Sequence, residues 1–139
     1  MKTKLAVVAA VAGMLVAAVP AWAHHAFAAE FDAKRPLTLK GKITKLEWIN
    51  PHSWIHIEVT GADGKATPWM IEGGSPNSMF RRGFTQQSLA LGTEIIVEGY
   101  QAKDGANRAV GSDLTFASDG KRLFMGSSSP DSPDAKRAK

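Results

Sequence analysis

Apolar and polar side chains alternate in several short runs along the chain, which is the pattern of β-strands packed on one face. Within residues 53–60, for example, Ile55, Ile57 and Val59 take one face, and polar or aromatic side chains take the other. We expect the aliphatic face to lie in the core. Similar runs predict strands at residues 38–48, 67–72, 94–100 and 109–116, with a short apolar piece at residues 123–124.

The first of these predicted strands carries a break in its alternation. Leu39 and Ile43 share one face, but the next apolar residue, Leu46, is one position out of phase with them. Because side chains on a strand alternate with a period of two, this shift predicts a β-bulge near Thr44-Lys45. The strand should bend sharply at that point.

Glycine, serine and proline interrupt the strands at residues 73–76 and introduce a short helix. Ser75 is a suitable N-cap, Pro76 is a suitable first helical residue, and Gly83 should end the helix. Three strands, a short helix and two more strands follow the order of the OB-fold, a five-stranded partly open barrel. The sequence therefore predicts an all-β domain with one short helix, built as a small OB-fold-like five-stranded barrel. A β-sandwich fragment or another small barrel would give a similar order of elements.

The first 23 residues have the three parts of a cleaved secretory signal peptide. Lys2 and Lys4 give a basic start, residues 5–19 are apolar apart from Gly13, and residues 20–23 place small residues at the cleavage positions. A transmembrane helix needs roughly 20 apolar residues, so this run is too short to be an anchor. No cysteine follows it to carry a lipid. We expect export to the periplasm and a mature chain, without a membrane anchor, that begins at His24.

These patterns divide the chain into four parts. Residues 1–23 are the predicted signal peptide, residues 24–36 an N-terminal extension, residues 37–125 the OB-like β-domain and residues 126–139 a tail. The tail is rich in serine, proline and charged residues and has no apolar pattern, so it is predicted to be disordered.

The charge balance argues against a nucleic-acid partner. Cleavage of the signal peptide would remove Lys2 and Lys4, which lowers 17 basic side chains to 15 against 13 acidic ones, a net charge of about +2. A nucleic-acid-binding protein usually concentrates basic residues on one face, and this sequence shows no such cluster. The chain also has no cysteine, so its stability must come from packing and not from disulfides.

The four histidines form two pairs, His24-His25 at the predicted mature N-terminus and His52 with His56 on one strand face. Residues four apart on a strand are about 13 Å apart, so His52 and His56 cannot bind one ion by themselves. An N-terminal histidine can bind a metal through its imidazole and its α-amine, whose pKa is about 7.7 to 8.0. Such a nitrogen-rich site suits Cu(II), so we predict a copper site formed by His24, His25 and His52.

A plainer interpretation of the same histidines stays open. His24 and His25 can be solvated residues of a flexible chain end. His52 can be a turn residue whose ring hydrogen-bonds the backbone. His56 is expected to pair with a carboxylate such as Glu58 or Glu72.

Aromatic residues predict a second kind of site. Trp54 lies beside His56 on the outer face of the predicted second strand, and an OB-fold uses the face of strands two and three to bind oligomeric ligands. We predict a ligand-binding surface of Trp54, His56, Trp48 and Arg82 for a glycan, a peptide or a partner protein, independent of metal. Alternatively, Trp48 and Trp69 close the core, and Arg82 belongs to a solvated helix face.

Catalytic motifs are sparse. The chain has no cysteine nucleophile, no glycine-rich phosphate loop and no serine in a strand-to-helix elbow, so an enzyme is not expected. The two main hypotheses are a periplasmic metal-binding protein and a metal-independent binding module. A copper-dependent oxidative enzyme is a third, for which the sequence identifies no substrate.

Several segments together resemble a known family. They are His24-His25-Ala26-Phe27, Glu47-Trp48-Ile49-Asn50-Pro51-His52, Ser75-Pro76, Arg82-Gly83 and Leu91-Gly92. The pattern is similar to that of a small exported bacterial family catalogued only as a domain of unknown function, family 6152. The resemblance implies export, a shared small β-domain and a place for His24, His25 and His52 in the family pattern. It implies no activity.

Overall fold

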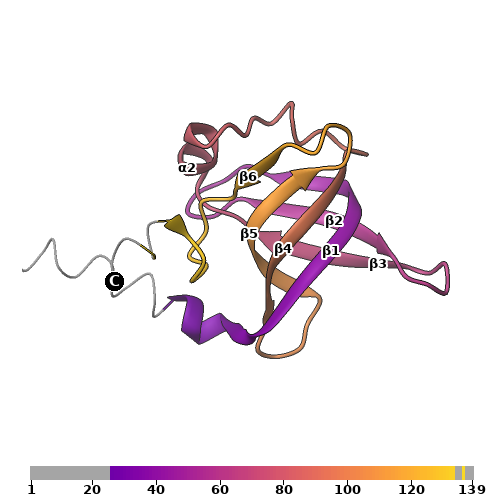
Figure 1. Cartoon of the computed structure of the whole chain (residues 1–139), viewed down its shortest axis with the longest axis horizontal. Coiled ribbons are helices and arrows are strands. Elements are labelled where there is room, and N and C mark those ends of the chain that lie inside the picture. The colour runs from indigo at the N-terminus through magenta and orange to yellow at the C-terminus, as the bar shows by residue number, and fades with distance from the viewer. Residues whose placement is uncertain (1–25, 134–135, 137–139) are drawn as a thin grey trace, which may run out of the picture.

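The structure is a computed structural model that describes residues 26–133 and residue 136. It is mostly β, with six strands and two short helices among these residues, one of them at residues 26–30 (Figure 1). The predicted signal peptide, His24 and His25 lie outside the described residues. Within the described part, no helix is long and apolar enough to cross a membrane. The labelled elements are β1 (Phe31–Glu47), β2 (Trp54–Thr60), β3 (Ala66–Glu72), α2 (Pro76–Arg81), β4 (Glu94–Ala102), β5 (Arg108–Phe116) and β6 (Arg122–Phe124).

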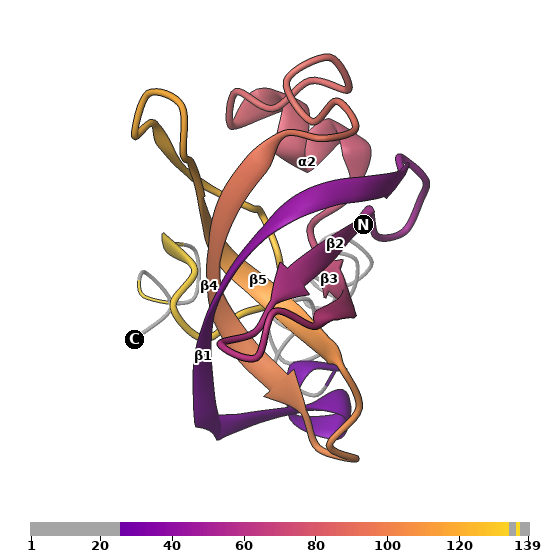
Figure 2. The same ribbon diagram turned by 90° about the vertical axis from the view of Figure 1, so that its right-hand side faces the viewer.

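The strands pair in the order β3-β2-β1-β4-β5-β6, and each pair of neighbours in this order is antiparallel. β3 also pairs with β5 in parallel. Among β1 to β5, each strand therefore pairs with two others of this set. Figure 2 shows β1 as a long, curved strand that runs beside both β2 and β4. The predicted β-rich fold is confirmed, with β6 as an additional paired strand.

The predicted bulge in β1 is confirmed at its predicted place. Ile43 pairs with Ile57 of β2, but Lys45 pairs with His56, so the register shifts between Ile43 and Lys45. The extra residue, Thr44, shifts the phase of the alternation, so that Ile43 and Leu46 both face the main core. β1 can therefore pair with β4 along its first part and with β2 along its second.

Helix α2 begins and ends as its local sequence predicts. The Ser75 hydroxyl accepts a hydrogen bond from the Ser78 amide at 3.2 Å, and Pro76 occupies the first turn. Gly83 follows the helix with a φ of 102°, a conformation that glycine adopts without steric cost. Met79 is the buried residue of the helix and joins it to the core.

The main core lies between the inner faces of the strands and α2. The alternation predicted for β2 is confirmed, since Ile55 and Ile57 are buried and Val59 packs against the cluster partly exposed. A second, smaller cluster lies at the other side of β4 and β5. Its members are Phe27, Phe31, Ala102 and Val110, with Tyr100 packed against them.

The boundary predicted between an N-terminal extension and the domain, at residues 36 and 37, does not match the structure. β1 already begins at Phe31, which is 2% exposed, and Phe27 in the preceding helix packs into the second cluster. The register of β1 against β4 shifts between Phe31 and Pro36. Because of this irregularity, the first residues of β1 do not show the strict alternation by which a strand is predicted from sequence.

The prediction of a disordered tail is also corrected for residues 126–133. Ser127, Ser129 and Ser132 are buried. The Ser127 hydroxyl donates to the Gly111 carbonyl at 2.5 Å, and the Ser112 and Ser129 hydroxyl oxygens lie 2.5 Å apart. Small polar side chains give no hydrophobic pattern, yet they can be buried when hydrogen bonds satisfy them. The tail therefore lies against β5.

Candidate functional site

His52 is held from one side of its ring. Its Nδ1 lies 3.3 Å from the carbonyl oxygen of Gly73 and 3.3 Å from Oε1 of Glu72. A carbonyl oxygen can only accept, so Nδ1 carries the proton and donates to Gly73. In the neutral ring, Nε2 then keeps its lone pair, and the side chain is 40% exposed. Nε2 is thus the ring nitrogen of His52 that can bind a ligand.

Glu72, which orients His52, is itself buried. It is the last residue of β3 and lies opposite Trp54 on one side and Val110 on the other. Burial raises the pKa of the Glu72 carboxyl above its ordinary value, and the nearby His52 opposes that rise. In many metal sites, a backbone carbonyl or a carboxylate beside the second ring nitrogen supports the ligating histidine.

The N-terminal helix lies near the same carboxylate. The negative charge of Glu30, the last helical residue, contributes to the raised pKa of Glu72. Glu30 also lies 3.9 Å from the guanidinium of Arg108, at the start of β5. Phe27 packs in one cluster with Val110, the residue paired with Glu72. Glu30 is therefore close enough to Glu72 for its charge to act on that carboxyl.

The predicted copper ligands are only partly described. Within residues 26–133 and 136, no group of three or more His, Asp and Glu side chains could hold a metal ion. Of the predicted set, His52 is described, whereas His24 and His25 lie outside the described residues. Their convergence with His52 stays a prediction.

His56 also has a carboxylate partner, but not one of those expected. Its Nε2 donates to Oε2 of Glu47 at 2.7 Å, and Lys45 donates to the other oxygen of Glu47 at 3.0 Å. These contacts, that of His56 first, lower the pKa of Glu47. The bulge in β1 places Lys45 opposite His56 and Glu47 diagonal to it. Glu47 is therefore the partner of His56, in place of the expected Glu58 or Glu72.

The predicted aromatic surface comes together only in part. Trp54 and His56 are two residues apart on β2, so they share its outer face, and both are half-buried. Trp48 packs against the main core instead. Arg82 places its guanidinium 4.5 Å from the centre of the Phe124 ring, a contact that joins the end of α2 to β6. Of the four residues predicted for this surface, Trp54 and His56 thus lie together.

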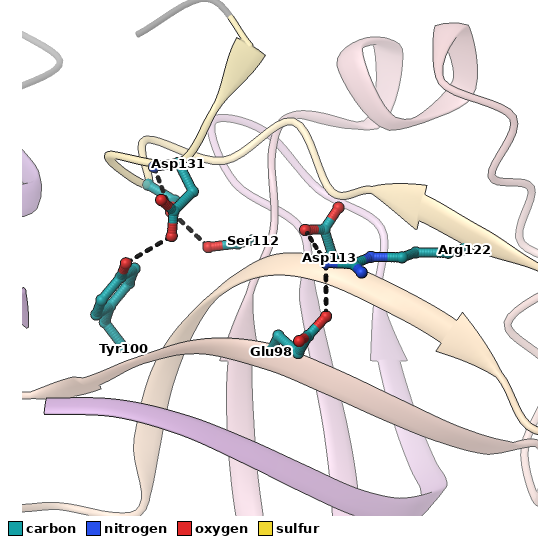
Figure 3. Close-up of polar contacts among 7 residues, drawn as sticks. Glu98, Tyr100, Ser112, Asp113, Arg122 and Asp131 are labelled. Carbon is teal, nitrogen blue, oxygen red and sulfur yellow. Dashed lines mark hydrogen bonds and ion pairs between the residues drawn. The ribbon is translucent and has the colours of Figure 1, made fainter. Parts of the chain in front are cut away.

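A polar cleft that the sequence did not predict lies over β1, β4 and β5. It encloses about 560 Å³. Figure 3 shows its network: Arg122 bonds Glu98 at 2.8 Å and Asp113 at 2.9 Å, while the Tyr100 hydroxyl donates to Asp131 at 2.5 Å. These side chains come from distant segments, so no spacing in the sequence could reveal the cleft. The Arg122 contacts join β6 to β4 and β5, and the bond from Tyr100 to Asp131 holds the tail against the sheet.

Comparison with protein families gives one match. The model of a family described as "Family of unknown function (DUF6152)" matches residues 10–111, which is most of the chain. No curated protein matches the chain.

Proposed function

The chain belongs to DUF6152, a family of unknown function, and we propose that this member is a periplasmic Cu(II)-binding protein that uses His52 with His24 and His25. The orientation of His52 carries the proposal. Its Nδ1 donates to the Gly73 carbonyl, with the Glu72 carboxyl 3.3 Å away, and this leaves Nε2 for a metal. Metal-ligating histidines almost always have such a partner for their second nitrogen.

The remaining ligands are proposed to come from the chain end. Ala26, the first described residue, directly follows His25, and the charge of Glu30 at the end of its helix acts on Glu72, the partner of His52. This relation supports the proposal that His24 and His25 come together with His52. Removal of the predicted signal peptide at residue 23 would add the α-amine of His24 as a further nitrogen ligand.

We also propose that the fold is an OB-fold-like five-stranded barrel. The parallel pairing of β3 with β5 supports this, because it gives each of β1 to β5 two strand neighbours. The position of α2 between β3 and β4 agrees with the OB-fold order. In that fold, the loop before β2 and the end of β3 are at a barrel rim, where a ligand site is accessible.

The test is titration with Cu(II) of protein purified after export, with its N-terminus determined. Calorimetry should show binding of one equivalent, and electron paramagnetic resonance should show nitrogen ligands. His52→Ala should weaken the affinity by about tenfold or more, since a ligand is lost. His56→Ala is the matched control, because His56 lies on the other side of Trp54 and should leave Cu(II) affinity unchanged.

Two outcomes would reject the proposal. One is the absence of Cu(II) binding. The other is equal affinity in the wild type and in His52→Ala, because binding would then be due to the N-terminal peptide alone.

A metal-independent binding module is the second candidate. The partly exposed Trp54 next to His56 favours it, because an aromatic ring on the outer face of β2 can stack on a flat ligand. A glycan, peptide or partner protein that binds there would change the fluorescence of Trp54. That change should disappear in Trp54→Ala and be insensitive to a metal chelator.

A further inference from the structure

Met70 presents a thioether on the outer face of β3. Its side chain is 37% exposed, whereas Met79 and Met125 are fully buried in the main core. Met70 lies directly across the β2–β3 ladder from His56. The pair therefore places a sulfur ligand and a nitrogen ligand side by side on one surface.

The backbone brings these two side chains especially close. The Met70 amide donates to the carbonyl of Asn107, just before β5, at 3.1 Å. In an antiparallel ladder, the N–H and C=O of a residue point to the same side, so those of Met70 point away from β2. His56 and Met70 are thus a non-hydrogen-bonded pair, the type in which Cα atoms are about 4.5 Å apart and side chains approach most closely.

A hydrogen bond to a carboxylate fixes the tautomer of His56. Its Nε2 donates to Glu47 at 2.7 Å, so the neutral ring keeps its lone pair on Nδ1. Glu47 is in turn held by Lys45 at 3.0 Å. A carboxylate that fixes the tautomer of a ligating histidine is a recurrent feature of metal sites.

We propose that Nδ1 of His56 and Sδ of Met70 form a binding site for Cu(I). Thioether sulfur is a soft ligand that selects Cu(I) over harder cations, and imidazole is a common companion ligand. Trp54, diagonal to Met70 on the same face, can cover the ion with its ring. The site differs from the proposed Cu(II) site in its residues and in the oxidation state of its metal.

The basic residues beside this pair have their own counter-charges. Lys45, opposite His56 on β1, forms an ion pair with Glu47. Arg108, beside Met70 on β5, lies 3.9 Å from a carboxylate oxygen in each of two ion pairs. This compensation lowers the electrostatic repulsion that a bound monovalent cation would meet.

The experiment uses Ag(I), a closed-shell ion that prefers the same ligands as Cu(I) and does not change oxidation state. NMR spectra of the purified protein are recorded during Ag(I) titration. The Met70 methyl signal and the His56 ring signals should shift together and saturate at one equivalent for this site. The Met79 and Met125 methyl signals, which report the core, should stay in place.

Two variants and one control decide the result. Met70→Leu conserves volume at an exposed position, and His56→Gln removes the ring; each should lower the Ag(I) affinity of this site by about tenfold or more. His52→Ala should leave the Met70 shift unchanged, which separates this site from the Cu(II) proposal. A Met70 methyl signal that does not move with Ag(I), or an unchanged affinity in either variant, would overturn the inference.

Discussion

At the scale of single residues, each of the two described histidines is held at a different nitrogen. His52 is bound at Nδ1 by Gly73 and Glu72, and His56 is bound at Nε2 by Glu47. In the neutral rings, the free lone pairs are therefore on Nε2 of His52 and on Nδ1 of His56. In each histidine, the nitrogen that donates a hydrogen bond to the protein is occupied, so the other nitrogen is the one that can bind a ligand.

Tyr100 gives a residue-level prediction about pH. Its hydrogen bond to Asp131 raises the pKa of its hydroxyl to about 12. The ordinary value is about 10, so this bond stabilises the fold below a pH of about 10, and the contribution is lost as the pH rises through the folded-state pKa. Tyr100 is the single tyrosine of the chain, so tyrosinate absorbance reports this group alone.

The matched variant for this titration is Asp131→Asn. It removes the negative charge, so the absorbance midpoint should fall from about 12 toward the ordinary value of about 10. If the two midpoints coincide, the tail does not contact Tyr100 in solution.

At the scale of elements, the tail acts as a continuation of the sheet. After β6, the Met125 amide still donates to the Ser112 carbonyl of β5 at 2.8 Å, and Ser127 and Ser129 then bond to β5 through their side chains. Both Ser112 and Ser129 are buried, and the Ser112 hydroxyl depends on that of Ser129 for a partner, whereas the Ser129 hydroxyl also accepts a hydrogen bond from the Asp131 amide at 3.3 Å. This dependence predicts strong coupling between the two residues.

A double-mutant cycle tests that coupling. Ser129→Ala leaves the Ser112 hydroxyl buried without its partner, which should lower the free energy of unfolding by about 1 to 2 kcal/mol. Ser112→Ala should cost less, because the Ser129 hydroxyl keeps its hydrogen bond from the Asp131 amide. The double variant should cost clearly less than the sum of the two, because no unpaired hydroxyl remains. Strictly additive losses in urea denaturation would show that the hydroxyls do not interact.

At the scale of the whole molecule, the helix at residues 26–30 belongs to the folded domain. Phe27 is 7% exposed and contacts Tyr100 edge to face, with ring centres 5.7 Å apart. The contact covers the outer face of β4 and β5 and holds the N-terminal segment beside Glu72. The docking of this helix in the second cluster should therefore contribute to the stability of the domain.

Phe27→Ala should lower the free energy of unfolding by about 3 kcal/mol, because it leaves a cavity in the second cluster. Phe80 on α2 is 65% exposed, so Phe80→Ala is the control and should change stability by no more than about 0.5 kcal/mol. Urea denaturation of both variants measures the difference. Equal effects would mean that the N-terminal helix is not docked.

The elements that the sequence predicted well are those specified locally. The bulge at Thr44 follows from a shift in a period of two, and the start of α2 follows from the capping chemistry of Ser75 and Pro76. The partner of His56 was not predictable in this way. It depends on how far β1 slides along β2, which local alternation does not specify.

By itself, the sequence determined the β-rich character, the inner face of β2, the site of the bulge and the position of α2. Each of these depends on interactions between residues close in the chain. Only the tertiary structure decided that β3 meets β5, that Phe27 and the tail serines are buried, and that His56 faces Glu47 and Met70. These contacts join distant segments, and their energies depend on register and on hydrogen-bond partners that exist only when the sheet is assembled.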